Sequence, residues 1–251
     1  MTIIVTRVVD WKRIRAGING KVGFVPTMGN LHDGHSALIK KSLAENDCTV
    51  ISIFINPTQF NNALDYDHYP RTIEQDLKKC GQFNVDYVFL PTQEELYIDG
   101  YEIKVEETNL SLCLEGEHRP GHFAGMLTIV LKLFNIIAPQ RAYFGEKDYQ
   151  QLLLIKKMVT NFFLPIEIRS VATVRSNEGL ALSSRNNRLT EVEKYKAIQF
   201  ATLLASKASC AEIKEKLAAN GINVDYIEEK WGRKLGAVFV GNVRLIDNVR
   251  G

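Results

Sequence analysis

The sequence lacks the features of a membrane, secreted or nucleic-acid-binding protein. No apolar run reaches the length of a membrane span, and the apolar stretch before Arg7 and Asp10 is too short for a signal peptide. The 31 basic and 29 acidic residues leave a net charge of +2. This balance gives no global reason to expect nucleic acid or an anionic membrane as a partner, so any anion must be bound by a local cluster.

Cysteine is scarce as well. The four cysteines, Cys48, Cys80, Cys113 and Cys210, lie far apart in the chain. None of their spacings matches a zinc site or a Cys-x-x-Cys redox motif. We therefore expect reduced thiols, most of them in the core, and a cytoplasmic protein.

The first two-thirds of the chain alternates strand-like and helix-like segments. Apolar, β-branched runs predict strands and 3.6-residue periodicity predicts helices. The expected strands are residues 2–5, 21–26, 48–55, 86–91, 141–146 and 166–174, and the expected helices are residues 35–46, 72–81, 125–139 and 148–162. This alternation predicts an α/β fold with a parallel, doubly wound sheet.

The pattern changes beyond about Thr190. Two helices are expected at residues 191–208 and 209–221, followed by short strands at 224–230, 237–241 and 243–249. This composition predicts a small α+β C-terminal domain. We place the two domains at residues 1–174 and 175–251.

Polar, glycine-rich segments follow the ends of several expected strands. They begin at Pro26, Asn56, Gly145 and Arg175. Parallel sheets bind ligands at the carboxyl ends of their strands, so these segments should line a ligand site.

Two histidines flank a glycine in the segment "PTMGNLHDGH". His32 and His35 are three residues apart at the start of a helix, which places both imidazoles on one side. Gly29 and Gly34 allow backbone amides to approach a phosphate closely, and the helix presents its positive end to the anion. The alternative is that His35 caps the helix and His32 is a surface residue; the paired arrangement favours phosphate binding.

Other segments are weaker signals when taken singly. In "GEKD", Lys147 suits a phosphate, although Asp148 could simply cap a helix. In "LALSSRN", two serines beside Arg185 could hold a triphosphate, or form an ordinary N-cap and turn. The amides of Asn56 and Gln59 in "NPTQFN", and of Asn62 directly after it, suit a small polar substrate, whereas Asn-Pro is also a turn signal. In "EGEHRPGHF", Arg119 and His122 could support the site or belong to a loop at a helix start.

Taken together, these segments resemble the pantothenate synthetase (pantoate–β-alanine ligase) family. The resemblance spans Pro26 to Asn186 and rests on six segments: "PTMGNLHDGH", "FINPTQFN", "DYDHYPRT", "LEGEHRPGHFAGMLTIVLKLFNI", "AYFGEKDYQQL" and "VRSNEGLALSSRN". The histidine motif alone is also shared with nucleotidylyltransferases and class I aminoacyl-tRNA synthetases.

The resemblance implies a reaction in two steps. ATP adenylates the carboxylate of (R)-pantoate and pyrophosphate leaves; the amine of β-alanine then attacks pantoyl adenylate to give pantothenate and AMP, on the way to coenzyme A. It further implies a Rossmann-like domain of the nucleotidylyltransferase superfamily type, a small C-terminal lid domain, a homodimer, and Mg²⁺ accompanying ATP. No serine or cysteine nucleophile is needed, because the substrate carboxylate attacks the phosphorus itself.

The resemblance also assigns site residues. His35 corresponds to the proton donor and His32 to its phosphate-binding companion; Gln59 and Gln151 correspond to pantoate contacts, with Gln59 also reaching β-alanine. Asn56 and Tyr69 fall where the family lines the substrate pocket. The ATP contacts are Met28, Gly29, Asn30, Leu31, His32, Asp33, Gly34, His35, Gly145, Glu146, Lys147, Asp148, Val174, Leu182, Ser183, Ser184 and Arg185. The residues expected to stabilise the reacting phosphates are His32, His35, Lys147, Ser183, Ser184 and Arg185.

Three rival interpretations and one departure accompany the resemblance. A nucleotidylyltransferase would not need Gln59 and Gln151, a tRNA synthetase would need an anticodon domain, and a regulator without turnover would not need the phosphate-binding side chains. The part after Thr190 is shorter than is usual for the family, although "VDYIE", "AVFVG" and "RLIDN" are present in order. Asp76 is a candidate magnesium ligand.

Overall fold

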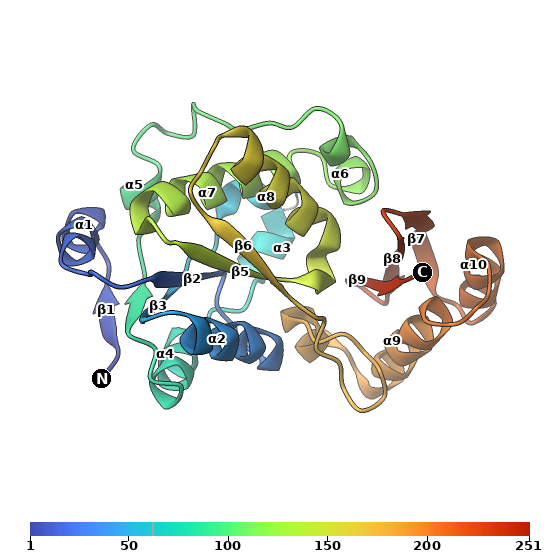
Figure 1. Ribbon diagram of the computed structural model, residues 1–251. Helices are drawn as coiled ribbons and strands as arrows, with labels where there is room; N and C mark the ends of the chain where they lie inside the picture. Colours follow the sequence, from blue (N-terminus) through green and yellow to red (C-terminus); the bar gives the residue numbers. More distant parts are fainter. Residues whose placement is uncertain (62) are drawn as a thin grey trace. The chain divides into compact units, whose positions relative to one another are not determined.

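A computed structural model describes residues 1–61 and 63–251 (Figure 1). The chain divides into two compact units. The first comprises Met1–Leu31, His35–Gly145 and Gln150–Val171, and the second comprises His32–Gly34, Glu146–Tyr149 and Ala172–Gly251.

The first unit is built on a six-stranded sheet in which all paired strands run parallel, in the order β1-β4-β3-β2-β5-β6. Its strands are β1 (Ile3–Val5), β2 (Val22–Thr27), β3 (Cys48–Ile53), β4 (Tyr87–Phe89), β5 (Arg141–Gly145) and β6 (Glu167–Val171). Every residue of β3 is buried. A strand covered on both faces needs a continuous apolar run, which explains why this segment does not alternate.

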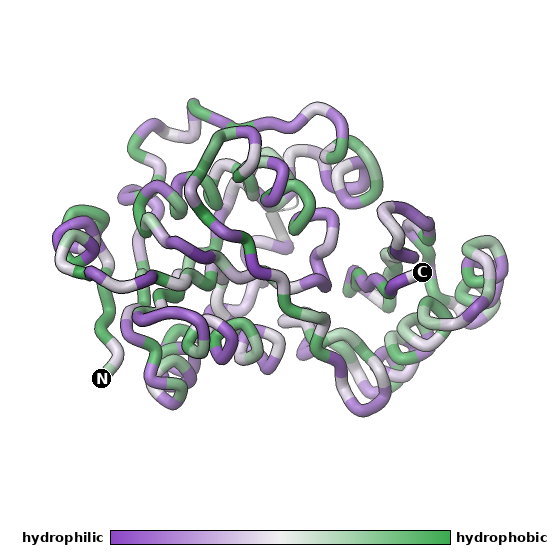
Figure 2. Tube along the Cα trace, in the orientation of Figure 1, coloured by the Kyte–Doolittle hydropathy of each residue, from purple (hydrophilic) through white to green (hydrophobic). Residues whose placement is uncertain are grey.

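Helices cover both faces of this sheet, with α2 and α4 on one face and α7 and α8 on the other (Figure 1). The α-helices that precede β6 in the chain are α1 (Val8–Ala16), α2 (Asp33–Glu45), α3 (Ala63–Asp67), α4 (Ile73–Gln82), α5 (Gln93–Leu96), α6 (Glu115–His118), α7 (His122–Ile137) and α8 (Tyr149–Asn161). Short 3₁₀ turns are η1 (Pro57–Gln59), η2 (Leu110–Leu112) and η3 (Glu146–Asp148). Hydrophobic and hydrophilic residues both occur along these helices (Figure 2). The predicted doubly wound α/β architecture is confirmed.

Two helices differ from the sequence-based expectation. The helix α1 was not predicted, because Trp11 is its one buried residue and it therefore has no apolar stripe. Its position depends on a distant contact, since the Trp11 indole donates a hydrogen bond to the Ile136 carbonyl at 2.9 Å. The helix α7 begins at His122 rather than at the predicted Gly125.

The strand order identifies where a ligand should bind to the sheet. From β2 the chain builds outward through β3 and β4 on one side, and then through β5 and β6 on the other. The order therefore reverses between β2 and β5, and sheets of this kind bind ligands at the carboxyl ends of the strands beside such a point.

The second unit contains an antiparallel sheet of β7 (Asn223–Lys230), β8 (Arg233–Val240) and β9 (Val243–Arg250). It also contains α9 (Glu191–Leu204), α10 (Cys210–Ala219) and the 3₁₀ helix η4 (Ser184–Arg188). Capping boxes at Thr190 and Ser209 begin the two α-helices. The predicted pair of helices followed by three strands is thus confirmed.

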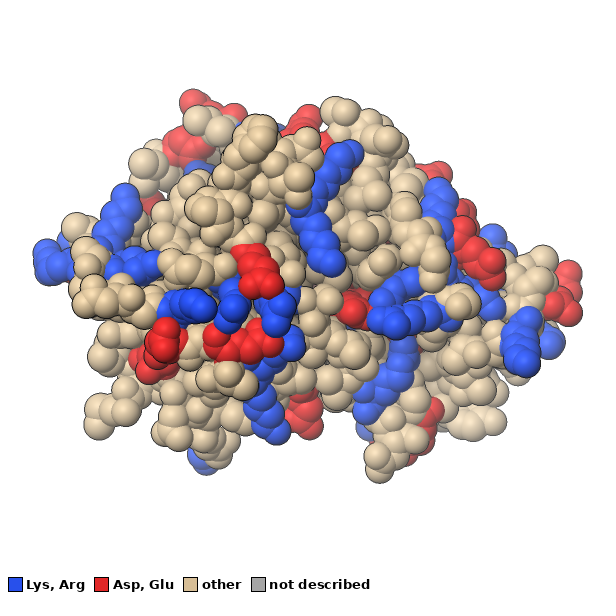
Figure 3. Space-filling view, viewed as in Figure 1, with Lys and Arg blue, Asp and Glu red and all other residues tan. Residues whose placement is uncertain are grey.

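Charge is mixed on the molecular surface. On the face drawn in Figure 3, basic and acidic side chains are interspersed, in keeping with the net charge of +2. Across residues 1–61 and 63–251, no helix has the length and apolar character required to cross a membrane.

Candidate active site

The loop after β2 has a backbone that only certain residues adopt readily. Gly29 and Asn30 have φ angles of +80° and +50°. A Cβ atom on Gly29 would lie 3.0 Å from Asp76 Oδ2 and 3.2 Å from Ile53 Cγ2. Position 29 therefore combines a left-handed conformation with close packing, and both favour glycine.

Asp76, on α4, holds this loop in place. Its carboxylate is only 2% exposed and accepts hydrogen bonds from the backbone N–H groups of Asn30 at 2.9 Å and Leu31 at 2.7 Å. It also accepts one from the Thr72 hydroxyl at 3.1 Å. Both carboxylate oxygens are therefore committed to protein donors, so Asp76 does not fit the magnesium-ligand hypothesis and serves to position residues 29–31.

His32 and His35 lie at the start of α2, as the sequence predicted. His32 belongs to the second unit and His35 to the first. The His32 Nδ1 atom accepts a hydrogen bond from the Gly34 N–H at 3.1 Å, so a neutral His32 ring carries its proton on Nε2. A Cβ atom on Gly34 would lie 2.7 Å from His32 Cε1, so a side chain at position 34 would displace the His32 ring from this position.

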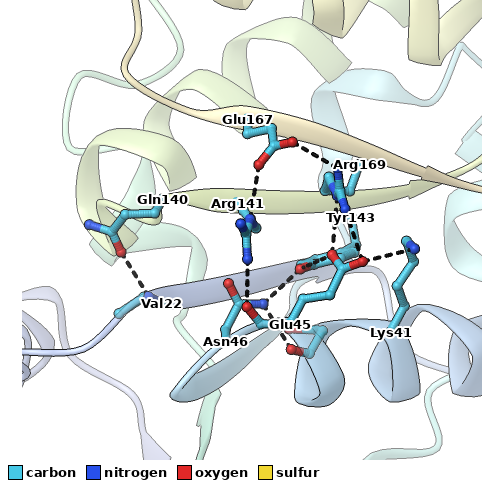
Figure 4. Close-up of polar contacts among 10 residues, drawn as sticks. Val22, Lys41, Glu45, Asn46, Gln140, Arg141, Tyr143, Glu167 and Arg169 are labelled. Atoms are coloured by element: carbon cyan, nitrogen blue, oxygen red, sulfur yellow. Dashed lines mark hydrogen bonds and ion pairs between the residues drawn. The ribbon is translucent and has the colours of Figure 1, made fainter.

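The opposite end of α2 is fixed by a charged network (Figure 4). Glu45 accepts hydrogen bonds from Arg169 at 3.0 and 3.1 Å and from the Tyr143 hydroxyl at 2.8 Å, and it pairs with Lys41 at 2.9 Å. The hydrogen bonds from Arg169 and Lys41 lower the pKa of Glu45 to about 2. Burial raises the pKa of Tyr143 to about 12, which keeps this hydroxyl protonated as a donor. The helix that carries His35 is thus anchored to β5 and β6.

The segment after β3 brings predicted site residues together. Asn56 and Gln59 are 1% and 8% exposed, and the Asn56 amide donates to Gln59 Oε1 at 3.2 Å and to the Gly125 carbonyl at 3.1 Å. The Gln59 amide in turn lies 3.0 Å from the sulfur of Met28. A glutamine expected to contact pantoate therefore touches the segment expected to contact ATP.

Tyr97 also supports this segment, although no motif in the sequence pointed to it. Its hydroxyl donates to Asn56 Oδ1 at 2.6 Å. Burial raises the pKa of Tyr97, so the hydroxyl remains protonated and able to donate.

Arg119 and His122 act on the same loop. The Nδ1 atom of His122, a residue 7% exposed, lies 2.8 Å from the Gln59 carbonyl oxygen. A carbonyl can only accept, so Nδ1 donates, and Nε2 of the neutral ring then accepts from Arg119 Nη1 at 3.0 Å. The sequence left open whether Arg119 and His122 support the site or simply belong to a loop. This arrangement favours support of the site, because the two side chains position the Gln59 backbone.

The remaining predicted substrate residues lie on separate elements. Tyr69 is buried, with its ring centroid 5.6 Å from that of Phe60. On α8, Gln150 is buried and bonded to backbone groups, whereas the neighbouring Gln151 is half-buried. Asn62 lies outside the described residues.

Most of the other predicted ATP residues belong to the second unit. Glu146, Lys147 and Asp148 form η3 directly after β5, with Lys147 Nζ 3.9 Å from Asp148 Oδ1. The Leu182 N–H donates to the Val174 carbonyl at 3.0 Å, which places these two predicted contacts side by side.

The "SSRN" segment forms a local helix start. The Ser183 side chain accepts from the Arg185 N–H at 3.2 Å, so Ser183 is the N-cap of η4, and Ser184 is buried. The N-cap interpretation of this motif is therefore correct, and it leaves the predicted phosphate role open. Among residues 1–61 and 63–251, no group of three or more His, Cys, Asp or Glu side chains is arranged to hold a metal ion.

Comparison with known proteins gives a consistent result over the whole chain. A family model described as pantoate-beta-alanine ligase matches residues 3–250. A pantothenate synthetase of Legionella pneumophila (strain Corby) is 54% identical over 241 residues, covering 95% of this chain and 96% of that protein. A pantothenate synthetase of Coxiella burnetii (strain Dugway 5J108-111) is 50% identical over 250 residues, covering 99% and 97%.

A solved structure is also similar throughout. The pantoate-beta-alanine ligase of Francisella tularensis, crystallised with beta-gamma ATP and beta-alanine, has a TM-score of 0.96 and 42% sequence identity, covering 100% of this chain and 98% of its own. The short C-terminal part is thus shared with these relatives. From the fold, the loops after β2 and β3, and these matches, the chain belongs to the pantoate–β-alanine ligase family.

Proposed function

We propose that this enzyme condenses (R)-pantoate with β-alanine at the expense of ATP, forming pantothenate, AMP and pyrophosphate through a pantoyl-adenylate intermediate. The pantoate carboxylate attacks the α-phosphorus of ATP, and pyrophosphate leaves. The amine of β-alanine then attacks the acyl carbon of the adenylate, and AMP leaves.

One observation carries this proposal beyond family membership. The Gln59 amide lies 3.0 Å from the Met28 sulfur, which joins the loops after β2 and β3 at the carboxyl edge of the sheet. A carboxylate held by Gln59 would therefore sit beside a nucleotide held by the β2 loop. Because the substrate is the nucleophile, catalysis requires positioning and charge stabilisation.

The chain's own residues divide into two groups by proposed role. One group positions pantoate and β-alanine: Asn56, Gln59, Tyr69 and Gln151. The other stabilises charge on the phosphates of ATP: His32, His35, Lys147, Ser183, Ser184 and Arg185. In this second group, His35 serves as the proton donor.

Further parts of the proposal concern the ion, the assembly and the location. Mg²⁺ would be held chiefly by the phosphates of ATP, as is common for nucleotide enzymes, and not by Asp76. The domain of residues 175–251 would act as a lid that keeps water from the adenylate, since a mixed anhydride hydrolyses readily. A homodimer follows from the family resemblance, and the unpaired thiols of all four cysteines suit a reducing cytoplasm.

ATP–pyrophosphate isotope exchange tests the reaction directly. With pantoate present and β-alanine absent, we expect exchange that depends on pantoate, because adenylate formation is reversible. AMP formation only after addition of β-alanine, without exchange, would refute the free adenylate. No reaction in either assay would favour a nucleotidylyltransferase or a regulator without turnover.

A further inference from the structure

The backbone around Lys147 is held by a side chain from the last strand of the chain. Asn248, on β9, is 3% exposed, and its amide donates to the Glu146 carbonyl at 2.9 Å and to the Lys147 carbonyl at 2.8 Å. These carbonyls belong to the two peptide groups on either side of the Lys147 Cα. Fixing both peptide planes fixes the direction in which the Lys147 side chain leaves the backbone.

A buried arginine completes this arrangement. Arg233, on β8, is 8% exposed and donates to Asn248 Oδ1 at 2.7 Å, so the amide is oriented with its N–H groups toward the two carbonyls. Arg233 also pairs with the Glu146 carboxylate at 2.5 Å, and its guanidinium lies 4.1 Å from the ring centroid of Tyr149. The η3 segment is therefore held at its carbonyls, at one side chain and at its following residue.

Asn248 is itself fixed from its other side. Its N–H donates to Asp247 Oδ1 at 2.7 Å, and Arg175 pairs with the Asp247 carboxylate at 2.6 and 2.9 Å. Arg175 also donates to the Asn248 carbonyl at 3.0 Å. A buried polar network in which every member is bonded is rigid, so position 248 can transmit a fixed geometry.

We propose that Asn248, oriented by Arg233, is a positioning residue for Lys147. Residues of the three-stranded sheet thereby determine how Lys147 is oriented toward the ATP phosphates. This inference rests on the proposed phosphate role of Lys147. Asn248, the last residue of the "RLIDN" motif, thus has a role beyond forming a strand of the sheet.

Asn248→Asp is the informative substitution. Aspartate has nearly the same shape and can still accept from Arg233, but it cannot donate to either carbonyl. We expect pantoate-dependent ATP–pyrophosphate exchange to slow by about 10- to 100-fold, because a shift of about 1 Å at a reacting group has an effect of this size. The KM for β-alanine in the full reaction should stay unchanged.

A double-mutant cycle with Lys147→Met separates positioning from general damage. If Asn248 acts through Lys147, Asn248→Asp should have little further effect in the Lys147→Met enzyme. An equal slowing in both backgrounds would overturn the proposal, as would wild-type exchange in Asn248→Asp. The matched control is Asp225→Asn, which weakens a 2.7 Å pair with Arg244 elsewhere in the same sheet and should leave exchange unchanged.

Two further results keep the inference distinct from the proposed function. If Lys147→Met exchanges at the wild-type rate, the phosphate role of Lys147 fails, and the positioning proposal fails with it. If Lys147→Met is impaired and Asn248→Asp is not, only the positioning proposal fails. Should Asn248→Asp not fold, Arg233→Lys replaces it in the cycle, since lysine keeps the charge beside Glu146 but cannot donate to both partners in the guanidinium geometry.

Discussion

Asp76 is the side chain whose removal should most clearly link local stability to activity. It accepts three hydrogen bonds, from Asn30 N–H at 2.9 Å, Leu31 N–H at 2.7 Å and the Thr72 hydroxyl at 3.1 Å. Asp76→Asn keeps the shape but replaces one acceptor oxygen with an N–H₂ group. At least one of the three donors then faces another donor.

The cost follows from these contacts. An unsatisfied buried donor costs about 1–3 kcal/mol, and bonds to a charged group lie toward the upper end, so Asp76→Asn should lose about 2–3 kcal/mol. For a protein of this size, that corresponds to a drop in Tm of roughly 4–12 °C. Asp76→Ala strands all three donors and should lose about 3–6 kcal/mol, a large part of a typical total stability of about 5–15 kcal/mol.

Asp76→Asn should also lower activity, because the loop after β2 loses its anchor. Residues 29–31 lead directly into His32, so release of the loop misplaces the groups expected to contact the phosphates. We expect pantoate-dependent exchange in Asp76→Asn to slow by about 10- to 100-fold at a temperature where the variant is fully folded. Circular dichroism melts establish that temperature.

Glu74→Gln is the matched control, because it makes the same chemical change at an exposed position of the same helix. It should leave both Tm and exchange near wild type. If Asp76→Asn melts and exchanges like wild type, the carboxylate does not anchor the loop. If Glu74→Gln is equally impaired, loss of helix charge and not loss of the loop contacts is the cause.

Two further predictions concern pH and packing. Hydrogen bonds from Arg169 and Lys41 lower the pKa of Glu45 to about 2, so these bonds stabilise the fold above pH 4.5, by about 1 kcal/mol because solvent screens this partly exposed group, and the stabilisation is lost as the pH falls toward 2. In urea unfolding, the stability difference between wild type and Glu45→Gln should therefore be greatest near neutral pH and vanish near pH 2; a pH-independent difference would contradict this. In Gly125→Ala, the new Cβ would lie 2.2 Å from the Thr58 carbonyl oxygen, so we expect a loss of about 1–3 kcal/mol and a raised KM for pantoate. The control Gly81→Ala meets nothing within 4 Å and should be neutral or gain up to about 1 kcal/mol, and a similar loss in both variants would exclude the steric explanation.

The segments with strong local patterns were predictable. The run Cys48–Ile53 is rich in β-branched and apolar residues and buried at every position because it lies in the middle of a covered sheet, and the strand prediction there is confirmed. By contrast, α1 has no such pattern, since only Trp11 is buried, and it was missed. Periodicity reports how one element faces the core, so a helix with a single buried residue leaves no periodic signal.

The sequence by itself determined the alternation of strands and helices, the two-part organisation and the motifs that place the chain in its family. Each of these depends on residues close together in the chain. Only the tertiary structure decided which distant side chains hold the site segments: Asp76 for residues 30 and 31, His122 for the loop of Gln59, and Asn248 for Lys147. These pairs are separated by 46, 45, 63 and 101 residues. Such contacts arise from strand order and helix packing, which bring remote segments together. Local residue patterns do not show which remote segments will meet.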